Sequence, residues 1–227
     1  MENLRRKLKR SESANRFLKD FGRFNYILTC DLETTSVRAN EGCWITGSFG
    51  ILDPVTLRLE DELDLKSKPY HWSEEARLVH KISEKTANQF PNRVETLHKL
   101  MNWLPKRSDF LFLCHARDWN FDQEINQKVY SHFDFGFLKM DFFLQGMYFD
   151  FCRHFNEQMV YSTISMARSL GFKDLKLNEL CDYFNIELSN HHDARADRIA
   201  MEEVLRKLAN YEEPIFSQRN GSSKLDS

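Results

Sequence analysis

Two acidic residues directly follow a short apolar run near the start of the chain. Residues 26–30 have the composition of a buried strand, and Asp31 and Glu33 continue it. Side chains two residues apart on a strand point to the same face, so these two carboxylates can converge on one point. Carboxylates held this close repel each other unless a cation lies between them, and oxygen ligands suit Mg²⁺ or Mn²⁺. Taken alone, the pattern is also that of a strand that turns polar where it meets solvent.

Further candidate ligands come from two distant segments. Asp122 follows a second apolar run, residues 110–114, and Asp197 lies one turn into a helix expected over residues 193–209. His192 directly precedes that helix. Carboxylates from three separate segments and one histidine are the side chains that a two-metal phosphodiesterase needs. The competing interpretation of His192 is a cap of the last helix, and Asp193 is the expected N-cap.

The elements that would position these residues form an α/β pattern. Strands are expected over residues 44–52 and 56–65, a helix over 94–104 and a central strand over 110–114. Ser73 and Ser83 are expected helix caps, a further helix is expected from Asn120 through Tyr130, and residues 133–154 are expected to be largely helical. This order predicts a mixed sheet in which antiparallel hairpins come first and parallel strands follow.

Length, net charge and cysteine content limit which classes of function the chain can have. The chain has 227 residues, enough for one domain with extensions, and its net charge of -2 gives no overall attraction for nucleic acid. No apolar run is long enough to span a membrane, so no membrane association is expected. The five cysteines are scattered without a C-x-x-C pair, which indicates reduced thiols and a cytoplasmic protein.

The two ends of the chain differ from the middle. Residues 1–22 form a basic N-terminal arm, with five Arg or Lys residues between positions 5 and 10. That arm could dock a nucleic acid or a protein complex, or it could be a solvated terminus. Residues 212–227 are expected to be a disordered tail, which leaves residues 23–211 for the folded domain.

In combination, the motifs resemble those of the DEDDh 3′→5′ exonucleases, a DnaQ-like family with a ribonuclease-H-like fold. Asp31-Leu32-Glu33-Thr34 is similar to the first motif, Phe121-Asp122 to the second, and His192 with Asp197 to the third. Val79-His80-Lys81-Ile82 is similar to a substrate-contacting loop of the family, with Lys81 in the place of a glycine. The resemblance covers residues 25–208, and its motif details are nearest to the bacterial exonuclease I branch.

The resemblance implies a mixed five-stranded ribonuclease-H-like sheet flanked by helices, and a two-metal-dependent 3′→5′ exonuclease. Such an enzyme releases nucleoside 5′-monophosphates from the free 3′ end of single-stranded DNA or RNA. Two Mg²⁺ or Mn²⁺ ions would be held by four carboxylates, and His192 would take the proton from the attacking water. The implied metal ligands are Asp31, Glu33, Asp122 and Asp197, and the implied substrate contacts are Thr34, Thr35, His80, Trp119 and Phe121. The alternative function is a non-catalytic or weakly catalytic docking subunit of a larger polymerase or ribonucleoprotein complex.

The third carboxylate of the set has two candidates. Phe133-Asp134-Phe135-Gly136 also resembles the second motif, in the form seen in the polymerase proofreading branch. If one helix runs on from Asn120, Asp134 lies about 20 Å along it, too far to reach the strand end. That geometry favours Asp122, and a break in the helix near Ser131 would reverse the choice.

Overall fold

The computed structural model describes residues 19–105, 109–115, 120–122, 127–129, 133–156, 159–173 and 175–211, without the side chains of 120–122 and 127–129. Most of the predicted basic arm and all of the predicted tail lie outside these ranges. Phe21, which falls inside the predicted arm, is fully buried in the core and contacts Tyr161 edge to face. The packed core therefore includes part of the segment assigned to the arm.

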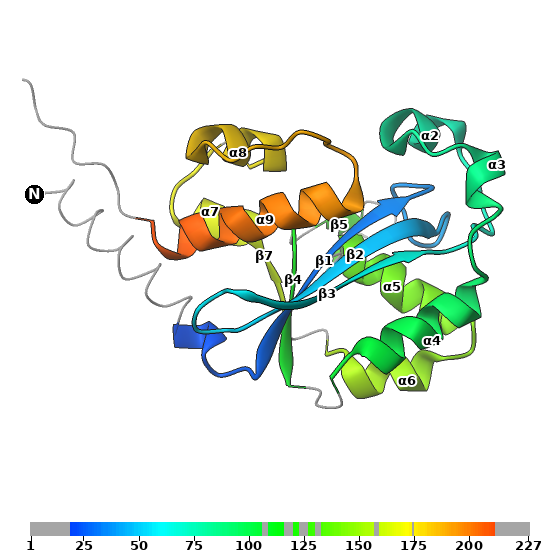
Figure 1. Cartoon of the computed structure of the whole chain (residues 1–227), viewed down its shortest axis with the longest axis horizontal. Helices are drawn as coiled ribbons and strands as arrows, with labels where there is room; N and C mark the ends of the chain where they lie inside the picture. The colour runs from blue at the N-terminus through cyan, green and yellow to red at the C-terminus, as the bar shows by residue number, and fades with distance from the viewer. Residues whose placement is uncertain are drawn as a thin grey trace, which may run out of the picture.

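A mixed sheet forms the centre of the fold, as predicted. Within the described residues it has five strands in the order β3-β2-β1-β4-β7 (Figure 1). The central strand β1 (Tyr26–Thr34) pairs antiparallel with β2 (Trp44–Leu52), which pairs antiparallel with β3 (Leu59–Lys66). On the other side of β1, β4 (Phe110–Cys114) and then β7 (Val160–Ser162) pair in parallel. The carboxyl ends of β1 and β4 consequently point to the same edge of the sheet.

Helices cover both faces of this sheet (Figure 1). One face carries α4 (Arg93–Trp103), α5 (Phe133–Leu144) and α6 (Tyr148–His154), and the other carries α7 (Thr163–Ser169), α8 (Leu177–Phe184) and α9 (Ala194–Ala209). Alternate residues of β4 belong to opposite apolar clusters, Phe112 to the first and Leu111 and Leu113 to the second. This strand is buried on both faces, as its unbroken apolar run predicts.

Two short helices lie near the carboxyl ends of β1 and β3 and the amino end of β2 (Figure 1). They are α2 (Glu74–His80) and α3 (Glu84–Ala87), and the side chains of Ser73 and Ser83 cap them as predicted. Among the described helices, none combines the length and apolar character needed to cross a lipid bilayer.

The prediction of a helix from Asn120 through Tyr130 is wrong. The described backbone there forms two short antiparallel strands, β5 (Asn120–Asp122) and β6 (Gln127–Val129), and α5 begins only at Phe133. The apolar spacing fits a helix, but Asn, Asp and Val are weak helix formers, and alternation fits a hairpin equally well. The break has a direct consequence for the site, because it allows Asp134 to begin a new helix.

Candidate active site

Three of the predicted carboxylates meet in one cavity at the carboxyl end of β1. Asp31 and Glu33 lie on the same face of the strand, and Asp197 reaches them from the first turn of α9. Oxygen atoms of the three side chains lie within 4.8 Å of one another. The cavity has a volume of about 860 Å³ and is also lined by His192 and Asp134. Asp193 caps α9 by accepting from the backbone N–H groups of Arg195 and Ala196, which fixes the start of the helix.

Asp134 joins this group, contrary to the reasoning that set it aside. It lies in the first turn of α5, is 4% exposed, and accepts a hydrogen bond from the Leu32 N–H of β1 at 3.2 Å. Asp122 is favoured only if one helix continues from Asn120, and the described residues 120–122 and 127–129 form strands instead. The side chain of Asp122 lies outside the described residues. The Phe-Asp-Phe-Gly sequence around Asp134 was the signal that pointed to this position.

The cavity holds more negative charge than its surroundings compensate. Burial, reinforced by repulsion from Asp134, Glu33 and Asp197, raises the pKa of Asp31 well above its usual range. Burial and the charge of Asp197 raise the pKa of Glu33 to about 8. Burial raises the pKa of Asp134 to about 7, against the opposing effect of the Leu32 N–H. A divalent cation would remove this penalty, and a donor set made only of carboxylate oxygens fits Mg²⁺ or Mn²⁺.

Two adjacent histidines face Asp197. The His192 backbone N–H donates to Asp197 Oδ2 at 3.0 Å, and His191 Nδ1 lies 3.0 and 3.1 Å from Asp197 Oδ1 and Oδ2. Burial and then the neighbouring His191 lower the pKa of His192, which keeps its ring neutral at pH 7. His191 is not among the predicted site residues, because nothing in the spacing marks its contact with Asp197.

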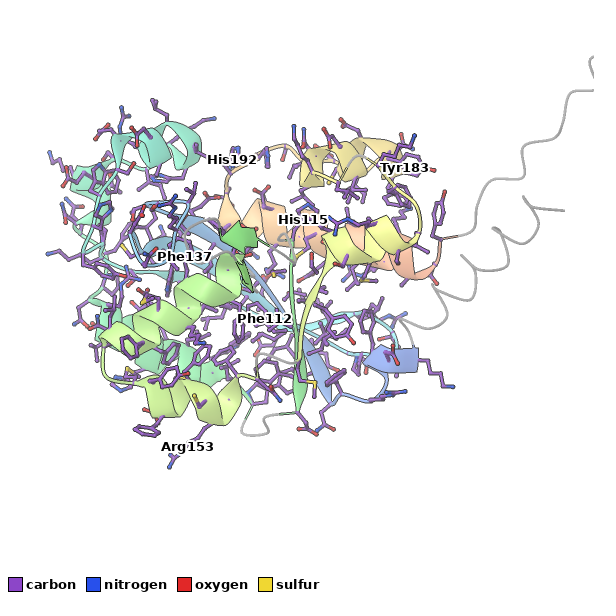
Figure 2. All side chains as sticks on the ribbon, turned by 180° about the vertical axis from the view of Figure 1, so that it is seen from behind. Phe112, His115, Phe137, Arg153, Tyr183 and His192 are labelled. Carbon is purple, nitrogen blue, oxygen red and sulfur yellow. The ribbon has the colours of Figure 1, made fainter. Side chains whose placement is uncertain are left out.

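Two further histidines line the cavity from other elements. His80 Nδ1 accepts from the Ile82 N–H at 3.1 Å, so the proton of the neutral ring is on Nε2. That Nε2 is buried and has no hydrogen-bond partner among the described residues. His115, at the end of β4, lies at the same end of the sheet as His192 (Figure 2), and burial lowers its pKa to about 4. Burial also lowers the pKa of His80, so both rings are neutral at pH 7.

The remaining predicted substrate residues divide into two groups. Thr34 and Thr35 line the cavity, but the Thr34 hydroxyl donates to the Ser36 carbonyl at 2.7 Å. The Thr35 hydroxyl is fully buried and accepts from the Cys43 N–H at 3.0 Å. These two hydroxyls hold the loop that follows β1. Trp119 lies outside the described residues, as does the side chain of Phe121.

A buried arginine anchors α9 beside the site. Arg198 is fully buried and donates to Glu202 on its own helix, to Glu62 on β3, and to Ser48 Oγ on β2 at 2.8 Å. Glu202 in turn accepts from the Thr29 hydroxyl of β1 at 2.6 Å. Ser48 is the cross-strand partner of Asp31. The network ties the first turns of α9 to three strands next to the carboxylates.

Arg198→Met is expected to destabilise the fold strongly. The change removes the buried cation that donates to Glu202 and leaves the more distant Arg206, 3.7 Å away, which costs about 3–5 kcal/mol and lowers Tm by about 10 °C. The matched control is Arg195→Met, three residues earlier, whose half-exposed side chain also pairs with Glu62. An exposed pair contributes less than about 1 kcal/mol, so the control should change Tm by no more than about 3 °C. Equal shifts in the two variants, measured by thermal unfolding, would contradict the anchoring role.

No protein-family model and no curated protein matches the sequence. Solved structures match in fold. Escherichia coli exonuclease I in complex with a dT13 oligonucleotide aligns with a TM-score of 0.67 and 17% identity over 84% of this chain and 42% of that chain. Cell-death related nuclease 4 aligns with a TM-score of 0.60 and 15% identity over 82% of this chain and 64% of that chain. A 3′-exonuclease that recognises the 3′ end of a histone mRNA stem-loop aligns with a TM-score of 0.60 and 14% identity over 84% of this chain and 65% of that chain.

At these identities the likeness shows the fold alone. It confirms the predicted ribonuclease-H-like architecture, a mixed five-stranded sheet flanked by helices. The chain spans less than half the length of the exonuclease I structure and less than two thirds of the other two.

Proposed function

We propose that the chain is a divalent-metal-dependent 3′→5′ exonuclease that removes nucleoside 5′-monophosphates from the 3′ end of single-stranded DNA or RNA. The observation that carries the proposal is the convergence of Asp31, Glu33, Asp134 and Asp197 with His192 in one cavity. The carboxylates come from three separate elements, and such crowding is costly without a bound cation. Nuclease neighbours of the same fold, one of them bound to single-stranded DNA, support the proposal.

We propose that Asp31, Glu33, Asp134 and Asp197 are the metal ligands. Together they would hold two Mg²⁺ or Mn²⁺ ions. Bound there, divalent cations would neutralise phosphate charge and make a water more acidic. His192 would accept a proton from the attacking water, since its ring is neutral at pH 7. The His80 Nε2–H has no partner among the described residues, and a small turn of this buried ring would let it donate to an oxygen of the terminal nucleotide.

The direct test is degradation of 5′-labelled single-stranded DNA and RNA of one sequence, with Mg²⁺, with Mn²⁺ and with EDTA. A metal-dependent ladder that shortens from the 3′ end, absent in Asp31→Asn, is the expected result. Comparison of the two substrates gives the sugar preference. Binding of both oligonucleotides without degradation would overturn the exonuclease proposal in favour of the docking subunit.

His192→Asn is expected to reduce kcat by about a hundredfold or more while leaving the gain in Tm on adding Mg²⁺ largely intact. Asparagine has no basic ring nitrogen, so it cannot accept the proton, and general-base catalysis contributes about 10²–10⁴-fold. Asparagine also tolerates the left-handed backbone at this position, where φ is 69°. Single-turnover rates and thermal unfolding with and without Mg²⁺ measure the two quantities. A loss of the Mg²⁺-induced gain equal to that in Asp31→Asn would assign His192 to metal binding instead.

A further inference from the structure

The loop before α9 directs two neighbouring imidazoles to the same side. Consecutive residues of an extended chain point in opposite directions. At His192 the backbone is left-handed, with φ of 69°, an uncommon conformation for a residue with a side chain. As a result the rings of His191 and His192 stack with centroids 3.9 Å apart and an angle of 24° between their planes. Both rings then lie beside the carboxylate of Asp197.

The donor atoms of these three residues are close enough to share one ion. A nitrogen of each histidine and an oxygen of Asp197 lie within 4.8 Å of one another, and His191 Nδ1 is 3.0 Å from Asp197 Oδ1. In a tetrahedral zinc site with bonds of about 2.0–2.1 Å, neighbouring ligand atoms lie about 3.3 Å apart. The His191–Asp197 separation already approaches that value. Both histidines are exposed enough to turn, whereas Asp197 is held at 5% exposure.

The chemistry of this group differs from that of the carboxylate group. Imidazole nitrogen is a good ligand for Zn²⁺ and related transition ions and a poor one for Mg²⁺. Asp31 and Glu33, which group with the same Asp197, offer only oxygen. Asp197 is thus a member of two donor sets with different metal preferences.

We propose that His191, His192 and Asp197 form a second site, overlapping the first at Asp197, for Zn²⁺ or a similar transition ion, and that its occupation blocks the exonuclease reaction. A bound ion engages the nitrogen of His192 that would accept the proton and occupies a carboxylate oxygen of Asp197, which the carboxylate group needs for its own cation. The binding half of this inference is independent of catalysis, and the inhibitory half rests on the proposed function. The site makes the enzyme sensitive to free Zn²⁺ at a fixed Mg²⁺ concentration.

Binding is tested by calorimetric titration with Zn²⁺ and by the visible absorption of Co²⁺ as a spectroscopic substitute. All variants carry Cys152→Ser, because Cys152 is an exposed thiol that could itself bind zinc. We expect His191→Ala and His192→Asn each to weaken Zn²⁺ binding by about tenfold or more, because each removes one of three ligands. Asp31→Asn should retain binding within about threefold, since Asp31 is not in this donor set. His98→Ala, an exposed histidine on α4, is the matched control and should bind like the parent protein.

Two outcomes would overturn the site. One is that the parent protein binds no Zn²⁺ at 1:1 stoichiometry up to about 100 µM free Zn²⁺. A site with three ligands should be occupied at that concentration. The other is the reverse pattern, in which Asp31→Asn abolishes Zn²⁺ binding and His191→Ala does not, which would place zinc among the carboxylates.

Inhibition is tested separately, with each variant compared with its own zinc-free rate. Zn²⁺ should inhibit the parent at concentrations that match its binding, and His191→Ala should need about tenfold more. Zinc binding by a protein without nuclease activity would refute the proposed function and leave the site standing. Nuclease activity that Zn²⁺ inhibits equally in the parent and in His191→Ala would refute the inhibitory role instead.

Discussion

Asp134→Asn should lower the rate of metal-dependent degradation by at least about a thousandfold, because it removes a charged ligand from the transition-state environment. The substitution is nearly isosteric, and the asparagine oxygen can still accept from the Leu32 N–H that Asp134 now engages. Burial already raises the pKa of Asp134 to about 7, so a neutral side chain at this position does not harm the fold. The loss should therefore appear in activity and in Mg²⁺ binding, with no loss of metal-free stability.

Asp122→Asn is the comparison that decides between the two motif candidates. We expect its effect on the rate to be smaller than that of Asp134→Asn by at least about a hundredfold. Asp150 is a half-exposed aspartate on α6 that pairs with Arg153, and Asp150→Asn controls for a general effect of removing negative charge. Steady-state rates over a range of Mg²⁺ concentrations, with thermal unfolding in EDTA, provide the data. A large loss in Asp122→Asn beside an active Asp134→Asn would restore the original assignment.

Sequence reasoning succeeded where the information is local. The bounds of β2 and β4 follow from apolar runs that end at polar or turn residues. Ser73, Ser83 and Asp193 are helix caps that can be predicted from residue type. The mixed sheet follows from the order of strands and helices. Strand geometry relates Asp31 to Glu33 directly, whereas the choice of Asp197 and His192 as their partners depended on the resemblance to the family motifs.

The errors arose where the chain turns without a strong local signal. Residues 120–130 carry apolar side chains at spacings that fit either a helix or a hairpin, and the wrong choice excluded Asp134 from the site. The contact of His191 with Asp197 depends on a left-handed backbone at His192, which residue type does not reveal.

Arg198 shows a different limit. Its i,i+4 relation to Glu202 is readable in the sequence, but such pairs are usually exposed on helix surfaces. Burial of the pair depends on how α9 packs against Ser48 and Glu62, two residues that lie far away in the chain. Long-range packing of this kind has no signature in a single local pattern.

The metal-free protein should lose stability as the pH rises from 6.5 to 8. Glu33 and Asp134, with pKa values raised to about 8 and about 7, hold their protons in the folded state over part of this range, whereas the unfolded chain has already released them. The folded state binds more protons, so raising the pH favours unfolding. The histidines with lowered pKa values, such as His115, act in the opposite direction, mainly below about pH 7, and offset part of this loss. In EDTA we therefore expect Tm to fall by on the order of 5–10 °C between pH 6.5 and pH 8.

Mg²⁺ or Mn²⁺ should reverse that loss, and by more at pH 8 than at pH 6.5, because protons and metal ions compete for the same carboxylates. Glu33→Gln separates the cause from other titrations. It removes the charge that burial opposes, so its Tm in EDTA at pH 8 should exceed that of the parent, while its gain on adding Mg²⁺ should shrink. A parent Tm in EDTA that stays constant from pH 6.5 to 8, or a Glu33→Gln variant that gains as much from Mg²⁺ as the parent, would contradict a cation-dependent carboxylate site. Taken with the Asp134 variants, this separates two properties of the same side chains: the cost of holding them together without a metal and their contribution to the reaction with one.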